Sequence, residues 1–580
     1  MPDDRNPLPE WADPEVPETA LDAQGGSRRA LLVRAGLFGA GFAGLSLLEG
    51  VPAAATPAAG TPALGESPAG AGPAPAGKAP LQPDDDPDLV YLVGDHHVHS
   101  VFSHDAKYTA AQLTRRAAQF GLDWMVFTEH SNVGHANAGG ALAEHAEVLK
   151  ARAENPRMLV FQGLEWYIPG AEHATVFTPP GPNEAEILRQ FELTFDGKLL
   201  GRTEGAPGHP DTAGNEALAV EAIRWLGERK RAGDVPDVLV LANHPSRLGI
   251  DSPHEIRAWR DADPDIMIGM EGAPGAQGAA LPARGATSIR GEYENKPSAR
   301  SWPGYPIEAY VTYGGFDWMT ATVGGLWDAL LSEGKLYSVT SNSDNHRTVL
   351  DTWRNGDWAP GANFDNTGRL PDPVDTDTPQ PGSDLWPGQF SRTHVGVTGF
   401  GYAEVMAGLR AGRVWVDHGQ LVDGLEVRLT DHLGRCRGAT LGGRVHVRKG
   451  ERLLLTITVT TASRPNYHGE IPTLARLDVI RGAVRGPAAD RDSWRAPDTR
   501  VVHTADVAGR TGTYTVKVPI EGVRESCYLR VRGSDGRRNG PGLLGAAIDP
   551  HGPLPHPPGD GDPWLDTWLY TNPIFVEVKK

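Results

Sequence analysis

Cysteine, positive charge and long apolar runs are all scarce in this sequence of 580 residues. The only two cysteines, Cys436 and Cys527, are too few for a disulfide framework or a thiolate metal site, although they could pair with each other. The formal net charge of -18 repels phosphate backbones. We therefore expect neither a nucleic-acid polymer nor an anionic membrane as a partner, and an anionic substrate would need a local positive centre.

The N-terminal segment contains an apolar run, but this run is short. Arg28 and Arg29 precede a glycine-rich apolar run over residues 35–48, and a small-residue cleavage site follows at 53–55. The run falls short of the ~20 residues that span a bilayer, so we expect no stable transmembrane span and disfavour a retained anchor. Residues 1–55 look like a twin-arginine signal. This resemblance implies the twin-arginine export machinery as a partner and a periplasmic, cell-surface or extracellular location.

Glycine, proline and apolar residues are plentiful. The chain has 71 Gly and 49 Pro, and hydrophobic residues make up 39%, so we expect a packed core together with long loops. The length also exceeds the roughly 100–200 residues of one domain. Residues 56–87 are nearly all Ala, Pro, Gly and Asp and predict a disordered linker. It is followed by a first domain at 88–420 and a second at 421–580.

Short apolar runs alternate with helical patterns in the first domain. The predicted strands are 89–93, 122–127, 158–161, 238–241, 266–270 and 336–339. The predicted helices are 109–120, 215–231 and 405–413. Thr109 and Gln112 have the spacing of a capping box at the start of the first helix. The alternation indicates an α/β fold with a parallel sheet and helical crossovers, most economically a barrel.

The pattern changes after about residue 421. Helical periodicity fades, and runs such as 452–460 and 513–518 alternate apolar and polar residues, as antiparallel strands do. The second domain is therefore predicted to be all-β and sandwich-like.

Imidazoles and carboxylates follow five of the predicted strands. In chain order they are His97 with His99, His130, Glu165 with His173, His244, and Asp344 with His346. Each residue alone has an ordinary explanation, such as a hydrogen-bonded loop histidine, but parallel strands bring their carboxyl ends to one rim. Imidazole and carboxylate without thiolate form a ligand set for Zn, Mn or Fe, and these residues are numerous enough for two or three divalent ions.

These residues also resemble the motifs of the PHP (polymerase and histidinol phosphatase) superfamily of metal-dependent phosphoesterases. Its D-x-H-x-H-[TS] motif matches 95–100, its T-[DE]-H motif 128–130, its G-x-E motif 163–165 with His173, and its S-D-x-H motif 343–346. Stretches similar to the CehA/McbA-type metallohydrolase branch are 121–123, 327–331, 411–413 and 562–576. The resemblance implies a distorted (β/α)7 barrel followed by an all-β domain. It also implies the ligands His97, His99, His130, Glu165, His173, His244, Asp344 and His346, with Glu165 bridging.

The first motif departs from the family at one position. The family commonly has an Asp five residues after the second motif histidine, whereas here His104 stands there and Asp105 follows. Three ions need roughly three protein ligands each, so we expect a ninth ligand in addition to the eight named above. We favour His104 and keep Asp105 as the alternative, because the loop could shift by one residue.

Clustered divalent ions favour hydrolysis by a metal-activated water without a protein nucleophile. Asp95 could orient an imidazole, while Arg247 and Arg347 could supply the positive charge that a phosphate needs. The sequence thus predicts an exported metal-dependent hydrolase, a phosphoesterase whose substrate is a small phosphate ester. The alternatives are a carbamate or ester hydrolase on the same metals, and a non-catalytic surface protein that binds metal or carbohydrate.

Export can be tested at the arginine pair. Replacing both Arg28 and Arg29 by Lys keeps the charge but removes the guanidinium geometry, so we expect the precursor to accumulate inside the cell. Cell fractionation and immunoblotting measure this outcome. Unchanged export of the double variant would indicate another route.

Overall fold

The computed structural model describes residues 89–103, 106, 108–131, 140–203, 209–273, 275, 296–346, 385–434, 438–466, 469–556 and 563–579. The predicted signal and linker, Cys436 and the candidates His104, Asp105 and Arg347 lie outside these ranges. Cys527 is a buried free thiol. Within the described ranges, no helix is both long and apolar enough to cross a membrane.

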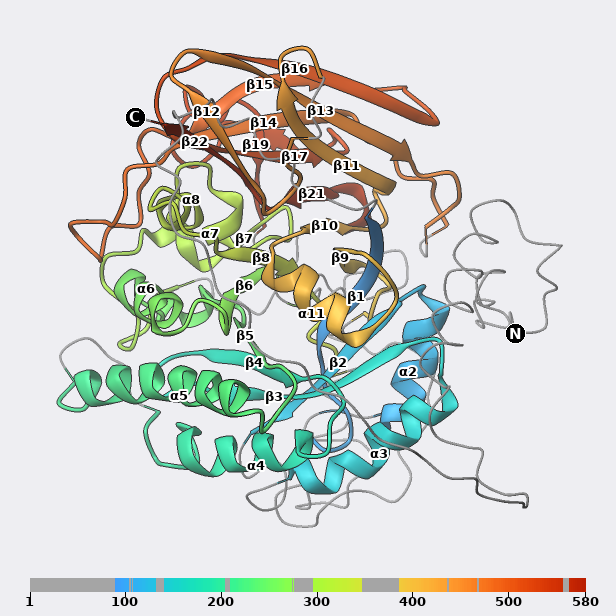
Figure 1. Ribbon diagram of the computed structural model, residues 1–580, viewed down its shortest axis with the longest axis vertical. Helices are drawn as coiled ribbons and strands as arrows, with labels where there is room; N and C mark the ends of the chain where they lie inside the picture. Colours follow the sequence, from blue (N-terminus) through green and yellow to red (C-terminus); the bar gives the residue numbers. More distant parts are fainter. Residues whose placement is uncertain are drawn as a thin grey trace, which may run out of the picture.

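A sheet rich in parallel strands forms the centre of the N-terminal part (Figure 1). Its strands are β1 (Val90–Val98), β2 (Trp124–His130), β3 (Leu159–Tyr167), β4 (His173–Thr178), β5 (Leu239–Ala242), β6 (Met267–Ala273) and β8 (Ser338–Ser341). They are hydrogen-bonded in this order, and β4 alone runs antiparallel to its two neighbours. The six predicted strands are present, whereas β4 was not predicted.

Several strands extend beyond their apolar runs into the polar motifs. His97 lies inside β1, His130 ends β2 and Glu165 lies inside β3. The expectation that these residues follow the strands is therefore wrong by a few positions. Backbone pairing continues past the apolar run because the neighbouring strand is still present, as in the pair His130 and Glu165.

Helices surround this sheet (Figure 1). They include α2 (Ala110–Gln119), α3 (Ala141–Glu154), α4 (Glu184–Phe195), α5 (Thr212–Ala232), α6 (Pro253–Ala262), α7 (Trp318–Ala321), α8 (Leu326–Leu331) and α11 (Tyr402–Arg410). The predicted capping box is confirmed, because Thr109 and Gln112 cap α2 reciprocally. The predicted helices at 215–231 and 405–413 correspond to α5 and α11.

The C-terminal part is β-rich and occupies the upper half of Figure 1. Its strands are β11 (Val422–Asp431), β12 (Arg444–Arg448), β13 (Glu451–Thr461), β14 (Arg476–Ala483), β15 (Arg500–Asp506), β16 (Thr513–Val523), β17 (Cys527–Ser534), β21 (Trp568–Thr571) and β22 (Ile574–Lys579). Strands β11, β13 and β16 form a separate sheet and share a buried apolar cluster with β14, β17 and β22.

The main sheet runs without a break from one part to the other. Strand β9 (Ser391–Val397) pairs with β1 and with β10 (Val414–His418), and β10 pairs with β21 of the C-terminal part. Hydrogen bonds therefore cross the predicted boundary at residue 421.

The N-terminal sheet nearly returns to its own first strand. The end of β1 meets the segment after β8 in one parallel bridge between Val98 and Asn345. Side chains from β9 and from the C-terminal part bind the backbone of β8. Ser341 N donates to Thr393 Oγ1 at 2.9 Å, and Val339 N donates to Asn572 Oδ1 at 2.9 Å. An exact (β/α)7 barrel stays a prediction, since the hydrogen-bonded strand path is open and β4 breaks the parallel alternation.

A buried ion pair joins the two parts. Arg530 of β17 donates to the carboxylate of Asp328 in α8, from Nε to Oδ1 at 2.9 Å and from a terminal nitrogen to Oδ2 at 2.8 Å. Both side chains are 0% exposed. Tyr528 Oη and Gly324 N also donate to this carboxylate, at 2.9 and 2.7 Å, and the guanidinium lies 4.6 Å from the Trp327 ring centroid. Removing one member would leave a buried, uncompensated charge.

We expect Arg530→Met to lower the free energy of unfolding by about 3–5 kcal/mol, because the buried carboxylate of Asp328 would lose its counter-charge. Arg485→Met is the matched control. Its ion pairs with Asp498 and Glu525 are about half exposed, and such pairs contribute under about 1 kcal/mol. Urea denaturation followed by circular dichroism measures both variants. Equal effects would contradict a special role for the buried pair.

Candidate metal centre

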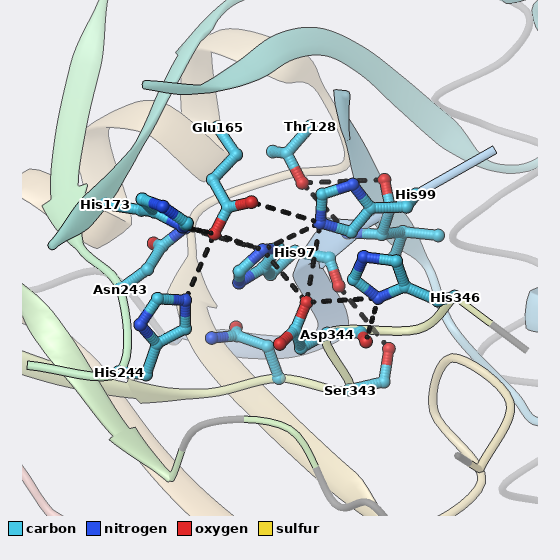
Figure 2. Close-up of polar contacts among 12 residues, drawn as sticks. His97, His99, Thr128, Glu165, His173, Asn243, His244, Ser343, Asp344 and His346 are labelled. Carbon is cyan, nitrogen blue, oxygen red and sulfur yellow. Dashed lines mark hydrogen bonds and ion pairs between the residues drawn. The ribbon is translucent and has the colours of Figure 1, made fainter. Parts of the chain in front are cut away.

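Histidines and carboxylates from several strands point toward one another (Figure 2). All eight side chains predicted from the strand ends lie together: His97, His99, His130, Glu165, His173, His244, Asp344 and His346. Each is less than a tenth exposed. The structure therefore brings together residues that are up to about 250 positions apart in the chain.

Glu165 lies at the middle of this cluster. Its Oε1 is 2.8 Å from His173 Nδ1, 3.1 Å from His244 Nε2 and 3.2 Å from His97 Nε2. Its Oε2 is 2.8 Å from His130 Nδ1 and 3.5 Å from His99 Nε2. One carboxylate thus touches five imidazoles, which suits a ligand that bridges neighbouring cations.

A second carboxylate approaches from the loop after β8. Asp344 Oδ1 lies 3.2 Å from His97 Nε2, 3.4 Å from His99 Nε2 and 3.5 Å from His346 Nδ1. Asp344 has a positive φ of 47°, a conformation that Asp tolerates better than most residues. This turn directs the carboxylate toward the imidazoles (Figure 2).

The donor atoms form three overlapping groups that could each hold a metal ion. They are His99 with His130 and His346, His97 with His99 and Glu165, and Glu165 with His173 and His244. In each group the ligand atoms lie within 4.8 Å of one another. His99 and Glu165 each belong to two groups, so ions bound there would share ligands.

The hydrogen bonds of His97 and His99 define their tautomers. His97 Nδ1 lies 2.6 Å from Glu271 Oε1, an acceptor, so this nitrogen donates. Ser103 Oγ donates to Glu129 Oε2 at 2.7 Å and therefore accepts from His99 Nδ1 at 2.9 Å. In the neutral rings both Nε2 atoms then carry lone pairs. They face each other at 3.0 Å, an arrangement that repels unless a cation or a proton lies between them.

The pKa directions within the cluster differ from residue to residue. Although burial lowers the pKa of His97, the charges of the neighbouring carboxylates hold it well above its usual value. Although burial raises the pKa of Glu165, the charges of His173 and His97 and hydrogen bonds from nearby imidazoles hold it well below its usual value. Burial and the neighbouring imidazoles of His346 and His130 lower the pKa of His99 well below its usual value. An ionised carboxylate and a neutral imidazole are the forms that bind metal.

This donor set and its spacing can be compared with known proteins. Residues 95–201 match the PHP domain family. The match contains five residues of the cluster, namely His97, His99, His130, Glu165 and His173, and the remaining three join them in space. No curated protein matches the chain.

Two solved structures match this chain at low similarity. One, from Bacteroides vulgatus ATCC 8482, is described as a two-domain protein containing a predicted PHP-like metal-dependent phosphoesterase; it is 13% identical, with 83% of this chain and 99% of that chain covered and a TM-score of 0.30. The other, from Bifidobacterium adolescentis ATCC 15703, is provisionally described as a metal-dependent phosphoesterase; it is 14% identical, with 31% and 76% covered and a TM-score of 0.18. Neither similarity is high enough to bear on function.

Two of the predicted auxiliary residues lie beside this cluster. Among the described residues, the carboxylate of Asp95 accepts hydrogen bonds from the backbone nitrogens of His97 at 3.0 Å and Ser343 at 3.1 Å. It therefore joins β1 to the loop that bears Asp344, and burial raises its pKa to about 7. Arg247 lies 3.4 Å from Glu172, whose carboxylate is 3.5 Å from His244 Nδ1.

The residue that orients His97 was missed in the sequence. Glu271 in β6 binds His97 Nδ1, accepts from His244 N at 2.7 Å and accepts from Asn342 Nδ2 at 2.8 Å. The sequence held a signal for it, because Glu271 directly follows the predicted strand 266–270. Ser103 and Asn243 were missed as well, and they contact the ligands His99 and Glu165. Glu129, also missed, accepts from Ser103.

We expect Glu271→Gln to weaken metal binding by about 10–100-fold, because an amide orients the His97 ring less firmly and lowers its basicity. Competition with a fluorescent chelator measures the affinity. Glu308→Gln is the matched control, since Glu308 is exposed in a 3-10 turn away from the cluster. Equal affinities of the two variants would contradict the orienting role of Glu271.

Proposed function

We propose that this chain is an exported metal-dependent phosphoesterase of the CehA/McbA-like branch of the PHP superfamily. The observation that carries the proposal is the convergence of His97 Nε2 and His99 Nε2, 3.0 Å apart, on the carboxylate of Glu165, whose pKa is held well below its usual value. Such an arrangement is costly to bury without a cation. The PHP match over 95–201 supports the same chemistry.

The proposed site holds two or three divalent ions, of Zn, Mn or Fe. The three overlapping donor groups would hold them, with Glu165 bridging two ions. When bound, such ions lower the pKa of a coordinated water, orient phosphate oxygens and neutralise charge on the leaving group. His104 or Asp105 is proposed to complete the ligand set, and the seven-stranded barrel is the architecture proposed to support it.

The protein's own residues fix the site for this reaction. Glu271 and Ser103 hold the Nδ1 sides of His97 and His99, so both rings direct Nε2 inward. Arg247, which is about a quarter exposed beside Glu172, is proposed to hold a phosphate oxygen, and Arg347 is proposed to add charge. The twin-arginine signal is proposed to export the protein after folding.

We expect the metal-loaded protein to hydrolyse phenyl phosphate or a diester, and both chelation and His97→Ala to reduce the rate by more than about 100-fold, beyond the loss of a merely orienting group. His503→Ala is the matched control, because His503 is exposed in β15. Rates and metal content by inductively coupled plasma mass spectrometry are measured together.

The outcomes separate the candidate reactions. Full activity of the chelated protein or of His97→Ala would contradict the assigned site. Hydrolysis of carbamates or carboxylic esters without any phosphate ester would favour the other hydrolase class. Bound metal without any hydrolysis would favour a binding protein.

A further inference from the structure

Tyr167 stands at the edge of the metal centre. It lies two residues after Glu165 in β3, so the two side chains share one face of the strand. Its register partner is His173 of β4, and the two ring centroids are 4.0 Å apart. The His130 ring is 6.2 Å away. The phenol ring therefore lies against two of the candidate metal ligands.

A tightly held loop after α4 lies over the end of β3. The buried carboxylate of Asp196 accepts from Leu199 N at 2.7 Å, from Tyr167 N at 3.3 Å and from the Ser131 hydroxyl. Gly197 N donates to Tyr167 O at 2.8 Å. A side chain at Gly197 would not fit, because its Cβ would lie 2.9 Å from Pro169 Cα. The loop is thus fixed to β2 and β3, which both end at the metal centre.

This loop places a cation beside the cluster. Lys198 Nζ lies 5.2 Å from the centroid of the Tyr167 ring, a cation–π distance. The side chain is exposed, and among the described residues the structure records no ion pair for it. Arg247, by contrast, has Glu172 beside it. In a chain of net charge -18, a cation beside the cluster that forms no ion pair with a described residue attracts anions.

We propose that Lys198, held over Tyr167, binds a second anionic group of the substrate, remote from the group that meets the metals. This inference rests on the proposed phosphoesterase function and narrows its substrate class to phosphate esters with a further carboxylate or phosphate. The ring of Tyr167 contacts both groups, because its centroid lies 5.2 Å from Lys198 Nζ and 4.0 Å from the His173 ring centroid. The fixed backbone of the loop and the contact with Tyr167 restrict the ammonium group before an anion binds, which reduces the entropy that binding would cost.

Two phosphonates that resist hydrolysis test the inference, phenylphosphonate and 3-carboxyphenylphosphonate. They differ in one carboxylate, and calorimetry on the metal-loaded protein gives both dissociation constants. We expect the wild type to bind the carboxylated analogue about three- to tenfold more tightly. Lys198→Gln should abolish this preference, and Lys198→Arg should retain most of it. Added salt should reduce the preference in the wild type.

Lys449→Gln is the matched control, because it removes the same charge from an exposed turn of the C-terminal part and should keep the preference. A wild type without the preference, a preference that survives in Lys198→Gln, or failure to bind either analogue would overturn the inference. The proposed function is judged separately by hydrolysis of phenyl phosphate. If phenyl phosphate is not hydrolysed but the Lys198-dependent preference is intact, the proposed phosphoesterase function is refuted and the anion site is not.

Discussion

The arrangement of the N-terminal part depends on one buried carboxylate. Glu165 touches five imidazoles that come from β1 and the segment after it, β2, β4 and the loop after β5. A buried carboxylate is costly unless cations or donors surround it, so each of these segments must place an imidazole within a few ångströms of the same point. Strand β4 meets this requirement with its first residue, His173.

The β-rich part also helps to position the residues of the cluster. Arg530 holds Asp328 at the start of α8, the helix that precedes β8, and Asn572 provides the acceptor for Val339 within β8. The loop after β8 bears Asp344 and His346. Contacts far from the cluster therefore fix the position of two of its members, and the two parts form one cooperative structure.

Sequence periodicity was enough to predict the parallel strands and the capped helix α2, and the motifs at the strand ends indicated the eight clustered side chains, because these signals are local. It could not predict β4 or its antiparallel direction, because both depend on the neighbouring strands with which β4 pairs. Nor could it assign Glu271 to His97, because that contact joins residues 174 positions apart and depends on the register of β6. The Arg530–Asp328 pair spans 202 positions and has no local signal either. Asp95 was predicted to orient an imidazole, and among the described residues its carboxylate accepts from two backbone nitrogens.

The amide of Asn572 also limits how this architecture can be rearranged. An edge strand normally finds its acceptors on another strand, but Val339 finds one on a side chain near the C-terminus. In a chimera whose terminal β region came from another protein, the backbone N–H of Val339 would lose its acceptor. The new region would have to contain a residue equivalent to Asn572. Strand β8 and the last two strands are therefore structurally dependent on each other, although more than 200 residues separate them along the chain.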